Sequence, residues 1–107
     1  MFFKNFAGTA MFSPEKMAKT NLARGEFMFA GLNCFEPGQE HAAHAHAGQD
    51  KLYVVLEGEA EITVGQEKQV IGAGGGAFAA SGVSHSVRNC GNTRLVMLAV
   101  LAPPPAK

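Results

Sequence analysis

The sequence lacks tryptophan altogether and has only one tyrosine and two cysteines in 107 residues. Cys34 and Cys90 are too few for a disulfide framework, so we expect buried free thiols and a reducing, cytoplasmic setting. Charge of one sign is also lacking, since nine basic residues balance nine acidic ones. This balance argues against nucleic acid or an anionic membrane as a partner. No apolar run is long enough to cross a bilayer, and no signal-peptide pattern opens the chain.

Glycine, by contrast, is abundant, with 13 residues. The apolar runs between the glycines are short, which is typical of many strands joined by tight turns. Gly65-Gln66 matches a two-residue hairpin loop that needs glycine first. The pattern predicts about eight to ten strands, no substantial helix and an all-β barrel or sandwich. We expect the following strands: 26–35, 51–57, 60–64, 68–71, 77–80, 83–89 and 94–101.

The length indicates one domain. Residues 1–25 are predicted to be an N-terminal arm with a short helical turn that starts at Ser13-Pro14. The barrel should occupy residues 26–102, and residues 103–107 form a proline-rich tail. Both faces of 26–35 and of 94–101 are apolar, more surface than one small barrel can enclose. We therefore expect a homodimer in which sheet packs against sheet.

Histidines carry the chemistry. His44 and His46 project to one side of an extended chain, so two imidazoles can reach one metal ion. His85, brought back by a turn between two strands, would complete a facial set of ligands. A solvated histidine loop remains the alternative for the first pair. His41 has the opposite parity in a continuous strand, so we expect it to point away, as a surface or rim residue.

Two blocks of spaced glycines and histidines resemble the two motifs of the cupin superfamily. The matching residues are Gly38, His44, His46 and Gly58 in the first block, and Gly74, Ala80, Gly82, His85 and Asn89 in the second. Alanine stands at position 80 where the family usually has proline. The resemblance implies a double-stranded β-helix, or jelly-roll, barrel. It also implies one divalent transition metal ion, Zn, Fe, Mn, Ni or Cu, bound by His44, His46 and His85.

The sequence departs from the family pattern at Lys51, where many cupins supply a carboxylate ligand. Asp50 could replace it only through a shift in strand register, which would reverse the face. Lys51 cannot stand as a charged group beside the ion, and we expect its amine near the barrel entrance, in water. Tyr53 is either a pocket residue or a core residue with a satisfied hydroxyl. Asp50, Lys51 and Tyr53 are therefore candidate pocket residues.

The resemblance gives a fold and a metal pocket but no reaction. The leading hypothesis is a metal-dependent enzyme, of oxygenase or isomerase type, acting on a small molecule. The alternative is a non-catalytic cupin that binds or senses a small ligand, with a structural or vestigial metal site. A dimeric scaffold with a vestigial site is a third possibility. An acid/base pair in the pocket would favour the enzyme, and the sequence displays none clearly.

Overall fold

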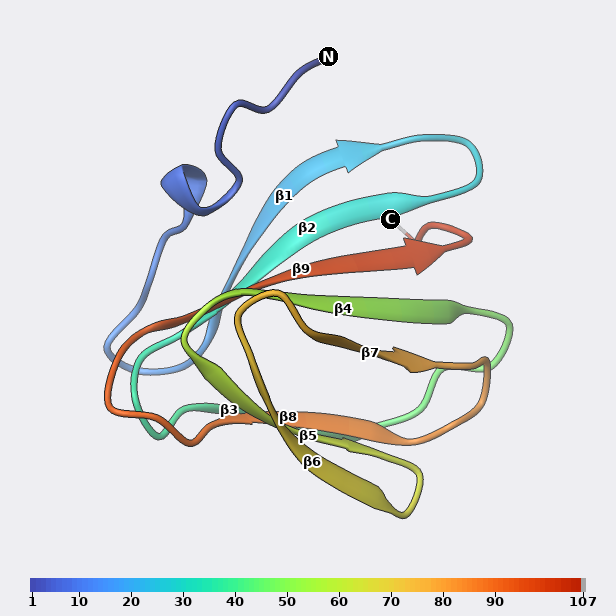
Figure 1. The fold of residues 1–107 in the computed structure, drawn as a ribbon. Coiled ribbons are helices and arrows are strands. Elements are labelled where there is room, and N and C mark those ends of the chain that lie inside the picture. Colours follow the sequence, from blue (N-terminus) through green and yellow to red (C-terminus); the bar gives the residue numbers. More distant parts are fainter. Residues whose placement is uncertain (107) are drawn as a thin grey trace.

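Short alternating runs form nine strands and two facing antiparallel sheets in the computed structural model, which describes residues 1–106 (Figure 1). The first sheet runs in the order β1 (Ala18–Arg24), β2 (Phe29–Phe35), β9 (Leu95–Ala102), β4 (Asp50–Glu57) and β7 (Gly76–Ala79). The second runs in the order β3 (Glu40–His44), β8 (His85–Asn89), β5 (Glu59–Val64) and β6 (Glu67–Gly72). This arrangement confirms the all-β jelly-roll prediction.

Two strands were not predicted. β1 (Ala18–Arg24) pairs with β2 and belongs to the sheet, so the ordered barrel begins before residue 26. β3 (Glu40–His44) is the second of these strands and forms within the histidine block.

The short helical turn lies at Ala7–Thr9 and not at Ser13 as predicted. The hydroxyl of Ser13 accepts a hydrogen bond from Glu15 N, but no helix follows. Of the proline-rich tail, Lys107 lies outside the described residues.

The core lies between the two sheets, where alternate side chains of both point inward. Its largest fully buried members come from β2, β4 and β9: Phe35, Tyr53, Val55, Leu95 and Met97. Burying such a side chain contributes about 1.5–3 kcal/mol each relative to exposure. These strands therefore anchor the sheet whose inner face also carries the site.

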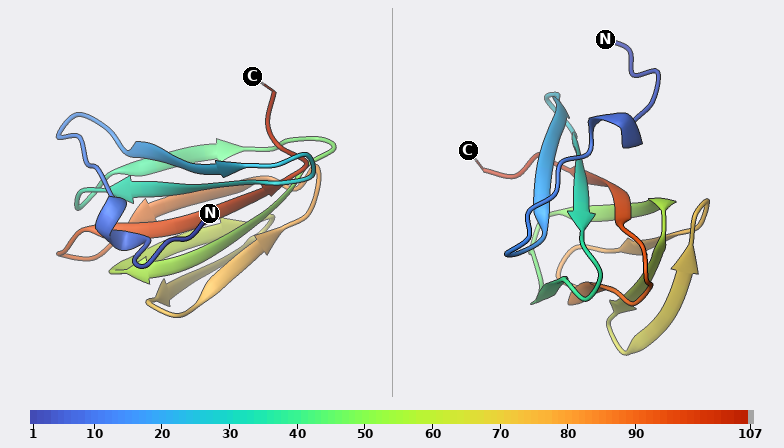
Figure 2. Two further views of the ribbon diagram at one scale, coloured as in Figure 1. Left: turned by 90° about the horizontal axis from the view of Figure 1, so that it is seen from above. Right: turned by 90° about the vertical axis from the view of Figure 1, so that its left-hand side faces the viewer.

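The protein's own N-terminal arm runs along the outer face of β2 and β9 (Figure 2). Phe6 and Phe12 pack against a second buried cluster of Leu32, Cys34 and Val96. Burial raises the pKa of the Cys34 thiol. Part of the apolar surface that led us to expect a homodimer is thus enclosed within one chain.

Gly58 joins β4 to β5 and shows why a glycine stands at this turn. Its φ is +85°, and a Cβ there would lie 2.5 Å from the carbonyl oxygen of Arg94. Gly65 has a φ of +61° between β5 and β6, as the hairpin prediction requires. Within residues 1–106, no helix is long and apolar enough to cross a membrane.

Candidate functional site

A cavity of about 900 Å³ opens at one end of the sandwich. Strands β1, β2, β3, β4 and β9, the β3–β4 loop and residues 103–106 of the tail form its walls. The tail is held there by two hydrogen bonds: Gln49 donates to Pro103 O at 2.9 Å, and Arg24 donates to Pro105 O. The polar lining consists of Lys19, Thr20, Asn21, Asn33, His41, His44, His46, Gln49 and Lys51. No aspartate or glutamate side chain of the described residues belongs to this lining.

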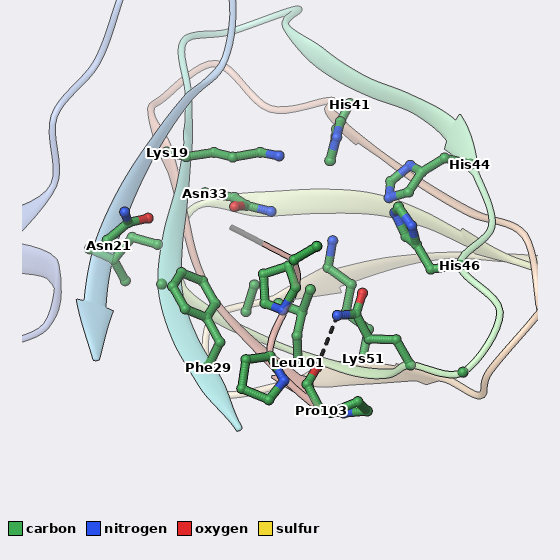
Figure 3. Close-up of a pocket in the computed structure, with 18 of the residues that line it drawn as sticks. Lys19, Asn21, Phe29, Asn33, His41, His44, His46, Lys51, Leu101 and Pro103 are labelled. Atoms are coloured by element: carbon green, nitrogen blue, oxygen red, sulfur yellow. Dashed lines mark hydrogen bonds between the residues drawn. The ribbon is translucent and has the colours of Figure 1, made fainter. Parts of the chain in front are cut away.

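The three predicted histidines gather at one side of the cavity: His44 and His46 belong to its lining, and His85 lies next to His44. His44 ends β3 and pairs in register with His85, the first residue of β8, while His46 lies in the loop after β3. The ring centroids of His44 and His85 are 4.2 Å apart, those of His44 and His46 4.9 Å, and those of His46 and His85 6.2 Å. His44 therefore occupies the centre of the cluster, with His46 beside it in Figure 3.

Backbone carbonyls fix the tautomers of His44 and His85. Nδ1 of His44 donates to Ala42 O at 2.8 Å, and Nδ1 of His85 donates to Val83 O at 3.0 Å, because a carbonyl can only accept. Both Nε2 atoms are buried and have no hydrogen-bond partner among the described residues. Burial lowers the pKa of both imidazoles, which favours the neutral form. A neutral imidazole with an outward Nε2 lone pair and a bonded Nδ1 is the arrangement found in metal-ligating histidines.

This donor set fits a metal ion in its chemistry and nearly in its spacing. Imidazoles that share an ion hold their ring centres about 4.5–5 Å apart. The separations of 4.2, 4.9 and 6.2 Å lie on both sides of that value. As they stand, no three His, Cys, Asp or Glu side chains within the described part of the chain are placed to hold an ion. A modest separation of the His44 and His85 rings would therefore have to accompany binding.

His41 does not point away from the other histidines, contrary to the sequence prediction. The β3–β8 register shifts between His41 and His44, so the alternation of faces is broken there. The His41 ring lies 4.4 Å from that of His44 and lines the cavity, and its Nδ1 is buried without a partner in residues 1–106. Burial, then the charge of Lys19, lowers its pKa to about 4. His41 thus joins the three predicted histidines at the site.

Lys51 lines the cavity, but its amine is not in water at the barrel entrance. This finding differs from the sequence prediction. Only 6% of it is exposed, and its Nζ lies 4.9 Å from the centre of the Tyr53 ring. Burial, followed by the charge of Lys19, lowers the pKa of Lys51 to about 8. The amine is therefore mostly protonated at pH 7 and faces the cavity as a poorly solvated cation. The aromatic face partly compensates for the lost water.

Asp50 and Tyr53 do not line the cavity. The Asp50 carboxylate is exposed and accepts a hydrogen bond from Ser81 N at 2.9 Å, which links the start of β4 to the β7–β8 turn. Tyr53 is fully buried in the core, with its ring centroid 6.0 Å from that of His85 and its hydroxyl without a partner in the described chain. Burial raises the pKa of that hydroxyl. Tyr53 is thus a core residue packed near His85. The prediction of a hydrogen-bonded hydroxyl for it was wrong within the described residues.

Asn33 is a cavity residue that sequence reasoning missed. It is 4% exposed on β2, and its Nδ2 has no hydrogen-bond partner among residues 1–106. The sequence did contain a signal for this residue, because Asn33 is the one amide side chain in the otherwise apolar run FAGLNCF. Asn89, in contrast, is structural: its Nδ2 donates to Phe35 O and Thr93 O, and its Oδ1 accepts from Gly91 N.

Comparison with known proteins places this architecture in a family. The model of the cupin domain matches residues 31–101. An oxalate-binding protein of Thermotoga maritima is 38% identical over 86 residues, which cover 80% of this chain and 68% of that protein.

Solved structures agree. A protein from Thermus thermophilus superimposes with a TM-score of 0.93 at 40% identity, covering 98% of this chain and 100% of that chain. A predicted oxalate decarboxylase from Thermotoga maritima has a TM-score of 0.69 at 33% identity, covering 73% of this chain and 68% of that chain.

Proposed function

The chain belongs to the cupin family, and from this premise we propose that it binds a small carboxylate anion beside a divalent metal ion. The observation that carries the proposal is the one-sided chemistry of the cavity. Its described lining combines Lys19, a buried Lys51 and three imidazoles with no carboxylate at all. Such a lining attracts an anionic ligand, whose negative charge would also balance that of the metal ion.

The metal would be held by Nε2 of His44 and His85 together with the imidazole of His46. Support comes from the two orphaned Nε2 atoms, whose tautomers the backbone already sets. When bound, the ion supplies positive charge and open coordination positions for ligand oxygens. His41 packs against His44 and holds that ring in place.

Binding fits the cavity better than proton-transfer chemistry. An acid/base pair left free in the pocket would have favoured an enzyme. No Asp or Glu of the described residues lines the cavity, and the proposal assigns its titratable side chains, histidines and lysines, to holding the metal ion and the anion. The names of the Thermotoga maritima matches, an oxalate-binding protein and a predicted oxalate decarboxylase, point to the same ligand class. We therefore favour a carboxylate-binding cupin over an oxygenase or isomerase.

Elemental analysis and thermal unfolding test this function. Protein purified without an affinity tag should carry, or take up, one Zn²⁺ per chain. A carboxylate at about ten times its Kd adds about 1.4 kcal/mol to the free energy of unfolding. At ~4–8 °C per kcal/mol, the Zn²⁺-loaded protein should melt about 6–11 °C higher with malonate. The neutral control malonamide should have no effect.

If the Zn²⁺-loaded protein melts at the same temperature with each carboxylate as without any ligand, the proposal is contradicted. Carbon-13 NMR of labelled oxalate incubated with the protein distinguishes binding from turnover. Disappearance of the oxalate signal would show an enzyme and would overturn the preference for a binding function.

We also infer a homodimer through the part of the first sheet that the arm leaves open. Leu52 on β4 and Phe78 on β7 are opposite each other and are 42% and 56% exposed. The half-buried Val54 and Val100 flank them on the same face. Phe78→Glu should give a monomer in sedimentation equilibrium, whereas Val70→Glu on β6 should not. A wild-type species of only 11.2 kDa at micromolar concentration would contradict the dimer.

A further inference from the structure

We propose a second recognition site in the same cavity, formed by Asn33 and Lys51 with Lys19, that binds the far carboxylate of a dicarboxylate longer than oxalate. The proposal rests on the proposed function, which places the near carboxylate beside the histidines. Figure 3 shows the amino groups of Lys19 and Lys51 and the side chain of Asn33 directed toward the space next to His41.

Strand register places the two donors of the β1–β2 side together. Lys19 on β1 and Asn33 on β2 are directly paired, so their side chains are neighbours on the inner face. Asn33 is 4% exposed, lines the cavity, and its Nδ2 has no partner among the described residues. A buried amide donor is costly unless something accepts from it. A ligand oxygen is the acceptor that the cavity can admit.

Lys51 faces the same space from β4, across a floor of small residues. Gly31 on β2 and Ala99 on β9 are paired with each other, and Ala99 is paired with Tyr53. Asn33 lies two residues after Gly31, and Lys51 lies two residues before Tyr53, so the two polar side chains flank this row. Gly31 and Ala99 both line the cavity, so residues with little or no side chain bound the space between the donors, with the Phe29 ring close to Gly31.

The cavity's size and charge determine what can span it. At about 900 Å³ it exceeds what an oxalate ion fills, and it lies in the range of pockets for larger ligands. All charged groups of its described lining are basic, so an amino acid or a polyamine would leave its ammonium group unpaired. A monocarboxylate would leave Asn33 and Lys51 without an acceptor. Sites built to hydrogen-bond a group discriminate strongly against analogues that lack it.

Isothermal titration of Zn²⁺-loaded protein with succinate, glutarate, oxalate and monomethyl succinate tests the inference. We expect wild type to bind succinate or glutarate at least about tenfold more tightly than the monoester, and more tightly than oxalate. Asn33→Ala should reduce the diacid-to-monoester preference to about threefold or less, with monoester affinity retained. Lys51→Met should reduce the same preference to about threefold or less and should also weaken the monoester, because it removes a positive charge that attracts either anion. Asn33→Asp should weaken the diacid further by repulsion. The surface variants Asn92→Ala and Lys16→Met serve as matched controls and should behave as wild type.

Two outcomes would overturn the inference, and they are distinguishable. If wild type binds the monoester or oxalate as tightly as the longer diacids, the second site is wrong while carboxylate binding stands. If no carboxylate binds the Zn²⁺-loaded protein, the proposed function fails together with the inference. Far-ultraviolet circular dichroism of each variant verifies that a lost preference is not a lost fold.

Discussion

Lys51→Met should make the protein more stable while it impairs ligand binding. Burial lowers the pKa of Lys51 from 10.5 to about 8. Since one pKa unit corresponds to about 1.36 kcal/mol, the charged amine costs the folded state about 3 kcal/mol at pH 7. Methionine fills a similar volume without a charge, so we expect it to recover most of this amount.

The difference in stability between wild type and Lys51→Met should depend on pH. Between about pH 8 and 10.5 the unfolded chain holds a proton on Lys51 that the folded chain has lost, so the stability of wild type should rise over this interval. Lys51→Met lacks that rise. The advantage of the variant should therefore be full below pH 8 and vanish near pH 10.5.

Urea unfolding of EDTA-treated protein, followed by circular dichroism at pH 7 and pH 10.5, measures both effects. The midpoint of Lys51→Met should lie about 2 M above that of wild type at pH 7, and the exposed control Lys16→Met should leave it unchanged. A variant that is less stable than wild type at pH 7, with no convergence at high pH, would refute the reasoning. It would mean that the amine is solvated in the folded protein.

Other variants separate the metal site from the fold. His85→Ala should abolish tight metal binding without unfolding the protein, because it removes one metal-facing Nε2, while His41→Phe should retain one ion per chain by elemental analysis. Asp50→Ala should keep full metal stoichiometry and lose about 1 kcal/mol in urea unfolding with its hydrogen bond to Ser81 N; loss of metal would identify Asp50 as a ligand. Gly58→Ala should lower stability by more than about 1 kcal/mol in thermal unfolding, given its φ of +85°, and an unchanged melting temperature would contradict that backbone analysis.

The sequence predicted the elements whose signals are local. Alternating apolar runs bounded by glycines gave most strands, and positive φ at Gly58 and Gly65 agrees with their predicted turns. The rings of His44, His46 and His85 lie together in the structure, but His46 lies in the loop after β3, so side-chain alternation alone does not place it. The strand and turn inferences depend only on side-chain alternation and turn chemistry.

What sequence reasoning missed depends on long-range contacts. The bulge that turns His41 inward is visible only once β3 is paired with β8. β1 is a polar segment that becomes a strand because β2 offers it an edge, and Lys19 faces the cavity for the same reason. The burial of Lys51 depends on residues distant in the sequence, since β1, β2 and the tail help to form the cavity that it lines. These features come from tertiary packing, which overrides local propensity.

The central claim is that a basic, histidine-lined cavity binds a carboxylate with the help of a metal ion. Isothermal titration of sodium malonate into Zn²⁺-loaded and EDTA-stripped protein tests it most directly, with the zinc content measured again afterwards to exclude extraction of the ion by the ligand. We predict one malonate per chain in the loaded protein, at least about tenfold weaker binding after stripping, and zinc still bound at the end. No heat of binding in protein that retains its zinc would contradict the account.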